Sequence, residues 1–206
     1  GGEAGRRDLV ATLRAAGLGV LVDLVPNHMG VAVPPANPSW WSLLRDGPGS
    51  PYASWYDVDL AGPVLIPVLG SPEDVDAVTL SEDGAELRYY EHRYPVAPGT
   101  GPDAVPGATP QEVHERQHYR LVDWRRGNAE LTYRRFFDVS DLAAVRVEDP
   151  AVFDATHAEV LRWRATGGLD GLRIDHPDGL SAPGAYLRRL RAALGESGEH
   201  ADRAWL

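Results

Sequence analysis

The sequence predicts an α/β fold built on a parallel sheet, because helical segments alternate with short apolar strands at both ends of the chain. Near the N-terminus, apolar residues at helical spacing over 9–16 precede Gly17, a natural C-cap. The run 18–25 is then almost continuously apolar, which is typical of a strand buried on both faces, and Pro26 ends it.

The C-terminal part repeats this pattern. Asp149 and Pro150 suit the N-cap and first position of a helix whose apolar stripe ends at the glycine pair 167–168. A strand is expected over 169–175, and a second helix from a Ser181 cap to Gly195. The residues 203–206 resemble the opening of one more strand.

The middle of the chain, roughly 30–146, is rich in proline, glycine and aromatic residues. It predicts a short strand at 86–90, a loop over 98–110 and a helix over 110–124. An insertion of this size indicates a subdomain attached to the C-terminal end of a strand, the edge at which α/β barrels build active sites. We therefore expect a barrel segment at 1–30, an inserted subdomain at 31–145 and a second barrel segment at 146–206.

The composition excludes several function classes. The 206 residues contain 30 acidic and 20 basic residues, all of the latter arginine, for a net charge of −10. The absence of lysine and cysteine excludes Walker-A loops, Schiff-base chemistry and thiolate sites. The acidic excess argues against nucleic-acid and membrane partners. The arginine pairs 125–126 and 134–135 are therefore expected to bind neighbouring acids or sugar hydroxyls.

Chemistry-bearing residues lie at the ends of both predicted strands. Arg173 and Asp175 alternate onto one strand face, which predicts an ionised carboxylate at the rim of a barrel, as a glycosidase nucleophile requires. The alternative is an Arg–Asp pair that only fills the barrel interior. Asn27 and His28 follow the first strand and are placed to touch a ligand, or else form a turn in which Asn27 satisfies backbone groups.

Two segments resemble signatures of the α-amylase family of (β/α)8-barrel enzymes, namely 23–28 (DLVPNH) and 171–176 (GLRIDH). Further segments resemble one subgroup of that family, the maltooligosyl trehalose synthases: 37–41, 50–59, 117–121, 133–138 and 173–180. The resemblance implies a partial (β/α)8 TIM barrel with a large inserted subdomain after strand 3.

The resemblance also implies roles for individual residues. Asp175 resembles the nucleophile that forms a covalent glycosyl-enzyme, and Arg173 resembles the residue that orients and ionises it. The implied substrate-binding residues are His28, Asp23, Asn27 and His176. Many amylases bind calcium at the position of Asn27, but we do not extend this to the synthase subgroup, so no metal and no cofactor are expected.

The implied reaction is an intramolecular transglycosylation in trehalose biosynthesis. The reducing-end α-1,4 bond of a maltooligosaccharide is converted to an α,α-1,1 bond, with retention in each of two displacements. The pathway partner would be a trehalose-releasing hydrolase, and the location cytoplasmic. The alternatives are another α-amylase-family α-glucan hydrolase or transglycosylase, and a module that only binds its ligand.

The length indicates an incomplete catalytic domain, since a (β/α)8 barrel takes about 250 residues without large insertions. The acid/base glutamate is expected beyond Leu206 and a third aspartate later still. Glu196 and Glu199 lie in a predicted polar loop and are not assigned this role. We therefore predict a fragment that is inactive by itself.

One motif favours a different class of enzyme. Residues 114–118 read H-E-x-x-H, which on a helix places His114 and His118 on one face with Glu115 beside them, as in zinc metallopeptidases. Polar residues at the two middle positions and the lack of a third histidine weaken this hypothesis. The alternative is a solvated helix.

Overall fold

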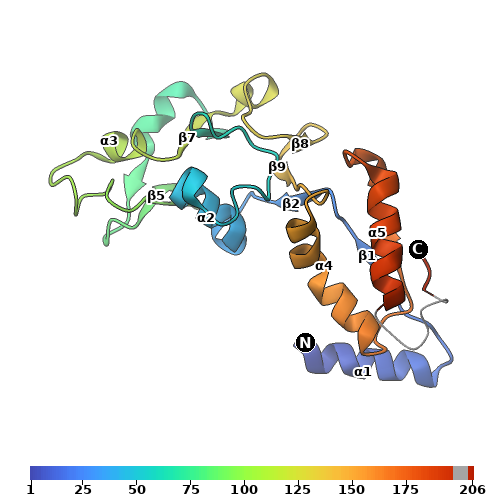
Figure 1. Cartoon of the computed structure of the whole chain (residues 1–206). Coiled ribbons are helices and arrows are strands. Elements are labelled where there is room, and N and C mark those ends of the chain that lie inside the picture. Colours follow the sequence, from blue (N-terminus) through green and yellow to red (C-terminus); the bar gives the residue numbers. More distant parts are fainter. Residues whose placement is uncertain (197–203) are drawn as a thin grey trace. The chain divides into compact units, whose positions relative to one another are not determined.

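The computed structural model of the chain describes residues 1–196 and 204–206, and it is a mixed α/β protein (Figure 1). The chain divides into two compact units. Unit 1 contains residues 1–27 and 146–206, and unit 2 contains residues 28–145. No helix within the described ranges has the length and apolar character needed to cross a membrane.

Unit 1 is built around two parallel strands. Its elements, in chain order, are α1 (Gly2–Ala15), β1 (Leu21–Leu24), α4 (Pro150–Ala165), β10 (Gly171–Ile174), the 3-10 turn η5 (Pro177–Gly179) and α5 (Pro183–Glu196). β1 and β10 pair in register from Leu21–Gly171 to Leu24–Ile174. Trp205 forms a parallel bridge to Gly171 on the other side of β10. The parallel pairing predicted from the apolar runs is confirmed.

The start of α4 follows the sequence prediction. Asp149 is its N-cap, and its side chain accepts a hydrogen bond from the Ala151 N–H at 2.8 Å. Pro150 occupies the first helical position, where its missing N–H costs no hydrogen bond. These local signals fix the helix start independently of the rest of the fold.

A buried imidazole joins α4 to α5. His157 Nδ1 lies 2.9 Å from the Phe153 carbonyl, and Nε2 lies 2.9 Å from the Tyr186 hydroxyl. Because a carbonyl can only accept, Nδ1 carries the hydrogen and Nε2 accepts from Tyr186. Burial lowers the pKa of His157, so the neutral ring suits this position.

Two predictions for unit 1 need correction. The first strand covers only Leu21–Leu24 and is not buried on both faces, since Leu18 and Leu21 are 55% and 53% exposed. Within the described part of the chain, β1 has a strand partner on one side only.

The second correction concerns α5. This helix begins at Pro183, two residues after the predicted cap Ser181, and it continues through Gly195. Glu196 therefore ends a helix rather than lying in a loop. Glu199 and Arg203 lie outside the described residues.

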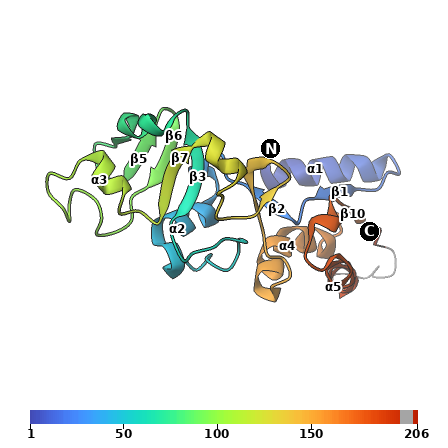
Figure 2. The same ribbon diagram turned by 90° about the horizontal axis from the view of Figure 1, so that it is seen from above.

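Unit 2 contains three small sheets. Its strands are β2 (His28–Gly30), β3 (Val64–Leu69), β4 (Thr79–Leu80), β5 (Glu86–Tyr89), β6 (His92–Pro95), β7 (Tyr119–Asp123), β8 (Arg135–Phe136) and β9 (Val139–Ala144), and its helices are α2 (Pro38–Asp46) and α3 (Pro110–His114). The sheets with the orders β2-β9-β8 and β4-β5-β6 are antiparallel. β3 and β7 pair in parallel and lie side by side in Figure 2.

Aromatic side chains form much of the unit 2 core. Trp40 is fully buried, and the rings of Tyr56 and Tyr133 meet it edge-on at centroid distances of 4.9 and 5.3 Å. Asn37 caps α2 by accepting a hydrogen bond from the Trp40 N–H. The cap therefore fixes the helix that carries the central tryptophan.

The predicted helix over 110–124 is wrong beyond its first turn. A capping box of Thr109 and Glu112 begins α3, but the helix ends at His114. The Arg120 guanidinium then donates hydrogen bonds to the carbonyls of His114, Glu115, Gln117 and Tyr119. These bonds hold a turn in place of further helix, and the next residues form β7 against β3.

Candidate functional site

The ends of β1 and β10 bring two predicted site residues together in unit 1. Asp23 and Arg173 are opposite each other in the strand register. Arg173 Nε donates to Asp23 Oδ1 at 2.7 Å, and Nη2 donates to Oδ2 at 2.5 Å. These two hydrogen bonds fix the plane of the guanidinium relative to that of the carboxylate. The side chains are 63% and 58% exposed, so this charged pair faces open space within unit 1.

Asp23 is the side chain to which Arg173 donates its hydrogen bonds. The pKa of Arg173 is raised, first by its hydrogen bond to Asp23 and then by the charge of that carboxylate, with a smaller contribution from Asp175. The guanidinium therefore orients Asp23 directly. Its influence on Asp175 is electrostatic and acts along the same strand face.

Asp175 lies one residue beyond β10. Its backbone N–H donates to the Leu24 carbonyl at 3.0 Å, which continues the parallel pairing past both strands. Its side chain is half-buried. The carboxylate is thus attached to a backbone position held by the neighbouring strand.

The turn after Asp175 is held by Asn27. His176 has φ 45° and ψ 55°, a left-handed conformation that is uncommon outside glycine. Asn27 is 2% exposed, and its Nδ2 donates to the His176 carbonyl at 2.7 Å. This bond agrees with the alternative in which Asn27 satisfies backbone groups of a turn. The His176 ring lies 3.6 Å from Asp178, measured from Nδ1 to Oδ1.

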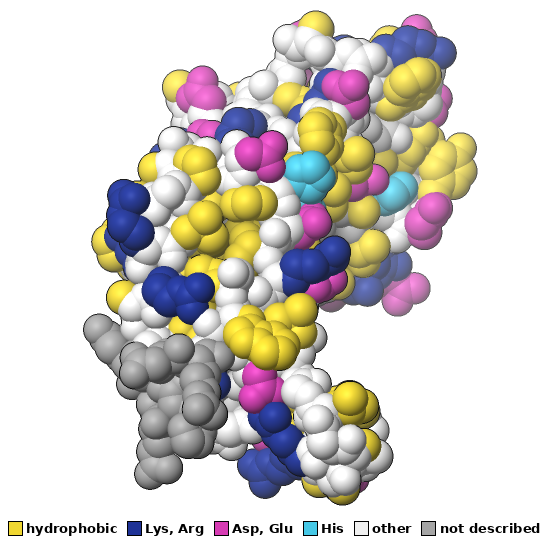
Figure 3. Space-filling view, turned by 90° about the vertical axis from the view of Figure 1, so that its right-hand side faces the viewer, with side chains coloured by type: hydrophobic (Ala, Val, Ile, Leu, Met, Phe, Trp, Pro, Cys, Tyr) yellow, Lys and Arg dark blue, Asp and Glu magenta, His cyan; other side chains and the backbone are white. Residues whose placement is uncertain are grey.

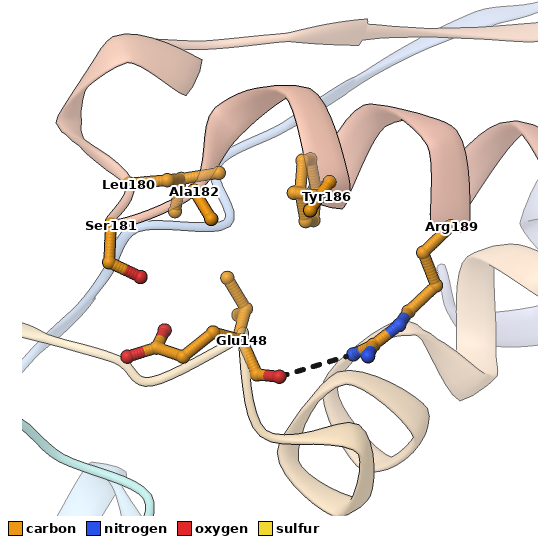
Figure 4. A pocket seen from close by; sticks show the side chains of 8 residues that line it. Glu148, Leu180, Ser181, Ala182, Tyr186 and Arg189 are labelled. Atoms are coloured by element: carbon orange, nitrogen blue, oxygen red, sulfur yellow. Dashed lines mark hydrogen bonds between the residues drawn. The ribbon is translucent and has the colours of Figure 1, made fainter.

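A small cavity lies farther along the same loop (Figure 4). Leu180 and Ser181 line it from the segment before α5, Tyr186 and Arg189 from that helix, and Glu148 from the segment before α4. Arg189 Nη1 donates to the Glu148 carbonyl at 3.4 Å. The cavity measures about 60 Å³, well below the roughly 300–1,000 Å³ of ligand pockets. It therefore suits ordered water rather than a sugar ring.

The remaining predicted site residue, His28, belongs to unit 2. It pairs with Ala144 at the start of β2. Its ring lies 4.3 Å from the Phe136 ring, and Phe136 meets Phe137 edge-on at 4.4 Å. Phe137 is 70% exposed and has φ 50°, so the turn between β8 and β9 presents a large apolar ring in a strained conformation.

Phe136 and Phe137, whose rings lie beside that of His28 and beside each other, are not among the site residues predicted from the sequence. The available signal was the aromatic doublet before Asp138 within the resembling segment 133–138. The structure holds their turn with Arg135, which donates to the Phe137 carbonyl at 3.1 Å and to the Asp138 carboxylate at 2.9 Å.

The H-E-x-x-H motif does not form the predicted helical face. His114 is 4% exposed, and its Nε2 accepts a hydrogen bond from the Leu121 N–H at 2.8 Å. Burial, with the nearby Arg120 charge, lowers the pKa of His114 to about 4. His118 packs instead against Gly47, where an added Cβ would lie 2.5 Å from its Nδ1. The zinc hypothesis and its solvated-helix alternative are both wrong, because His114 is a buried hydrogen-bond acceptor at the end of α3 and the helix does not continue to His118.

The arginine pairs bind neighbouring acids, as predicted. Arg126 bonds Glu130 at 2.6 Å and Arg134 bonds Asp57 at 2.7 Å. On the face drawn in Figure 3, acidic, basic and hydrophobic side chains are interspersed.

Comparisons with known proteins identify relatives of this chain. No family model matches it. A Mycobacterium tuberculosis protein named "Putative maltooligosyl trehalose synthase" is 48% identical over 198 residues, which are 95% of this chain and 25% of that protein. The structure of maltooligosyltrehalose synthase from Arthrobacter ramosus matches 94% of the chain and 25% of its own, at 54% identity and a TM-score of 0.88. The chain is a homologue of the maltooligosyl trehalose synthases.

A third match is also a solved structure. The structure of a hypothetical maltooligosyl trehalose synthase from Sulfolobus tokodaii is 34% identical, with a TM-score of 0.79 over 96% of this chain and 26% of that one. The chain thus spans about a quarter of the length of these maltooligosyl trehalose synthases. The resemblance found in the sequence motifs is confirmed.

Proposed function

We propose that this chain is part of an intramolecular transglycosylase that converts the reducing-end α-1,4 bond of maltooligosaccharides to an α,α-1,1 bond. The observation that carries the proposal is the similarity to the Arthrobacter ramosus synthase, at 54% identity over 94% of the chain. The substrate class follows from the names of the relatives, and the placement of Asp175 at a strand end supports the chemistry.

The proposed fold is a portion of a (β/α)8 barrel. β1, β10 and the segment at Trp205 would be neighbouring barrel strands, and α5 would connect the last two. The residues 31–145 would then be a subdomain inserted between the barrel segments 1–30 and 146–206. The parallel order of these strands supports this arrangement, since barrel strands run in parallel and are joined by helices.

Asp175 is the proposed nucleophile. Its carboxylate would attack the anomeric carbon of the sugar on the non-reducing side of the terminal bond, while an acid protonates the leaving oxygen. The released glucose stays bound, and its anomeric hydroxyl attacks the glycosyl-enzyme from the face that the leaving group occupied. Each displacement inverts the reacting carbon, so the two together retain its configuration.

The other site residues would support this carboxylate or the sugar. The Arg173–Asp23 pair fixes the strand ends and adds a positive charge on the strand face of Asp175. Asn27 is a positioning residue, because it holds the His176 carbonyl directly after the nucleophile. His28 would bind the sugar with Phe136 beside it, and an aromatic face suits the apolar C–H face of a pyranose.

A partner and a location complete the proposal. The product has no reducing end, so a trehalose-releasing hydrolase would be the enzyme that consumes it. The expected cytoplasmic location stays a prediction, as does the expectation that no cofactor is required.

The test uses the full-length protein and maltopentaose. We expect reducing ends to disappear with little release of glucose, measured by a reducing-sugar assay beside a glucose assay. An α-glucan hydrolase would instead raise the number of reducing ends, and a binding module would leave both values unchanged. Either result would overturn the proposal.

A substitution tests the nucleophile. Asp175→Asn should lower kcat at least about 1,000-fold, because removing a nucleophile abolishes the covalent route. The matched control is Asp154→Asn, which alters an exposed carboxylate on α4 and should leave kcat unchanged. Equal turnover of both variants would exclude Asp175 as the nucleophile.

A further inference from the structure

An open groove on unit 2 is lined by none of the site residues assigned above. It measures about 590 Å³, within the range typical of ligand sites. Trp41 and Tyr52 line it, together with ion-paired side chains from α2 and from the β5–β6 hairpin. We call this surface the Trp41 groove.

The two tryptophans of α2 have different surroundings. Trp40 is fully buried in the core, whereas Trp41 is partly exposed and lines the groove. Neighbouring residues on a helix point in different directions, so only one of the two serves the core. The ring of Tyr52 is supported by Trp55, which meets it edge-on at a centroid distance of 4.9 Å. The groove therefore presents two aromatic rings, of which that of Tyr52 is held by a ring contact.

Two carboxylate–guanidinium pairs border these rings. Arg45 bonds both oxygens of Asp46, at 2.9 and 2.8 Å, and the Ser42 hydroxyl donates to the same carboxylate at 3.0 Å. Arg93 bonds both oxygens of Glu86, at 3.0 and 2.5 Å. The hydrogen bonds from these arginines lower the pKa of both carboxyls, so they stay ionised at neutral pH.

The charges of the groove disfavour a cationic ligand. Asp46 is bonded by one guanidinium, and Glu86 by two, from Arg93 and Arg88, so a cationic group would find no uncompensated carboxylate. The guanidiniums remain about half exposed, at 47% for Arg45 and 51% for Arg93. They can donate further hydrogen bonds, while the carboxylates accept them.

A pyranose matches this combination of surfaces. Its C–H face is apolar and stacks on aromatic rings, and its rim carries hydroxyls that both donate and accept. We propose that the Trp41 groove is a second saccharide-binding site, which holds a stretch of α-glucan chain away from the reacting end. The choice of α-glucan rests on the proposed function, whereas a saccharide is favoured by the groove itself.

The test compares long and short substrates in the full-length protein. Trp41→Ala combined with Tyr52→Ala should raise KM for amylose roughly tenfold, since losing aromatic stacking costs about 1.4 kcal/mol. KM for maltotriose and kcat for both substrates should be unchanged, because binding and reaction of a short substrate require only the residues proposed at the reacting end. Trp41→Phe should retain most of the wild-type KM for amylose.

Trp124→Ala is the matched control. Trp124 is 53% exposed, lies outside the groove and stacks with Arg125. This variant should behave as the wild type with both substrates.

A direct binding measurement separates this inference from the proposed function. Titration calorimetry with maltoheptaose on the Asp175→Asn protein should give two classes of site, one of which the Trp41/Tyr52 substitutions remove. If the protein proves to be an α-glucan hydrolase, the proposed function fails while this result still stands. A single class of site in both proteins would overturn the groove, even if the transglycosylase activity is confirmed.

Two other outcomes would also overturn the inference. A fall in thermal stability of the Trp41/Tyr52 variant with unchanged maltoheptaose binding would make the groove a packing surface for another part of the protein. Binding of a proline-rich peptide, but not of maltoheptaose, to the wild-type groove would make it a peptide site.

Discussion

The two units each contain one pair of parallel strands, and the two pairs are used differently. In unit 2, β3 and β7 carry Val64, Tyr119 and Leu121, all at most 3% exposed. In unit 1, β1 and β10 carry the Asp23–Arg173 pair, both members of which are more than half exposed. Within the described residues, the same backbone pairing therefore contributes mainly core side chains in unit 2 and carries an exposed charged pair in unit 1. Strand pairing alone does not reveal which use applies.

Breaking the buried pair should have the largest effect. Leu121→Ala should lower the free energy of unfolding of unit 2 by about 3 to 4 kcal/mol, because it removes buried methyl groups and leaves a cavity. Hydrogen exchange of segment 119–123 in the full-length protein measures this loss. The turnover per folded molecule should remain that of the wild type. A loss of less than about 1 kcal/mol would contradict the assignment of β3 and β7 to the core.

Breaking the exposed Asp23–Arg173 pair should affect turnover much more than stability. Arg173→Gln should reduce kcat on the order of a hundredfold, about 2.7 kcal/mol, by releasing Asp23 and removing a charge beside Asp175. In the 206-residue chain, where both side chains are more than half exposed, its effect on unfolding should stay below about 1 kcal/mol. Steady-state kinetics of the full-length protein with maltopentaose and thermal unfolding of the 206-residue chain measure the two effects. Unfolding without a specific fall in kcat would support the alternative that the pair only fills a barrel interior.

Lowering the pH should weaken the start of β7 through His114. The folded pKa of about 4 lies below the ordinary 6.5, so the unfolded state binds more protons between these values and stability falls as the pH drops. At pH 5 this linkage amounts to roughly 2 kcal/mol. Exchange of the Leu121 amide, corrected for its intrinsic rate, should increase accordingly between pH 7 and pH 5. His114→Gln, which does not titrate, should abolish this pH dependence.

The smallest effect is expected at the surface of unit 2. Arg126→Gln removes the pair with Glu130, whose members are 45% and 50% exposed. It should change the free energy of unfolding by less than about 1 kcal/mol. Added salt should narrow this difference in thermal unfolding further, because solvent ions screen exposed charges. A difference that persists in 1 M salt would indicate a contribution beyond the ion pair.

Local signals predicted the parts of the fold that depend on local interactions. The pair Asp149–Pro150 located the start of α4, because an N-cap bond and a proline at the first position act within one turn. The helix predicted over 110–124 failed because Arg120 reaches back to four carbonyls of the preceding turn. No apolar periodicity reports such a contact.

The candidate site was predictable in outline only. Strand alternation placed Arg173 and Asp175 on one face, but the partner of Arg173 is Asp23, 150 residues earlier and on the neighbouring strand. Register between distant strands is set by the assembled sheet, so one strand cannot reveal it. The exposure of Phe137 likewise depends on the left-handed turn between β8 and β9.

The turn around Arg120 shows why a lysine could not replace arginine at this position. The planar guanidinium carries its N–H groups on separate nitrogens. Nη1 contacts the carbonyls of His114, Gln117 and Tyr119, and Nη2 contacts that of Glu115. An ammonium group has all its donors on one nitrogen, so a lysine here could not place donors at both of these positions. At this position the two basic residues are not equivalent, and the shape of the whole turn depends on one delocalised cation.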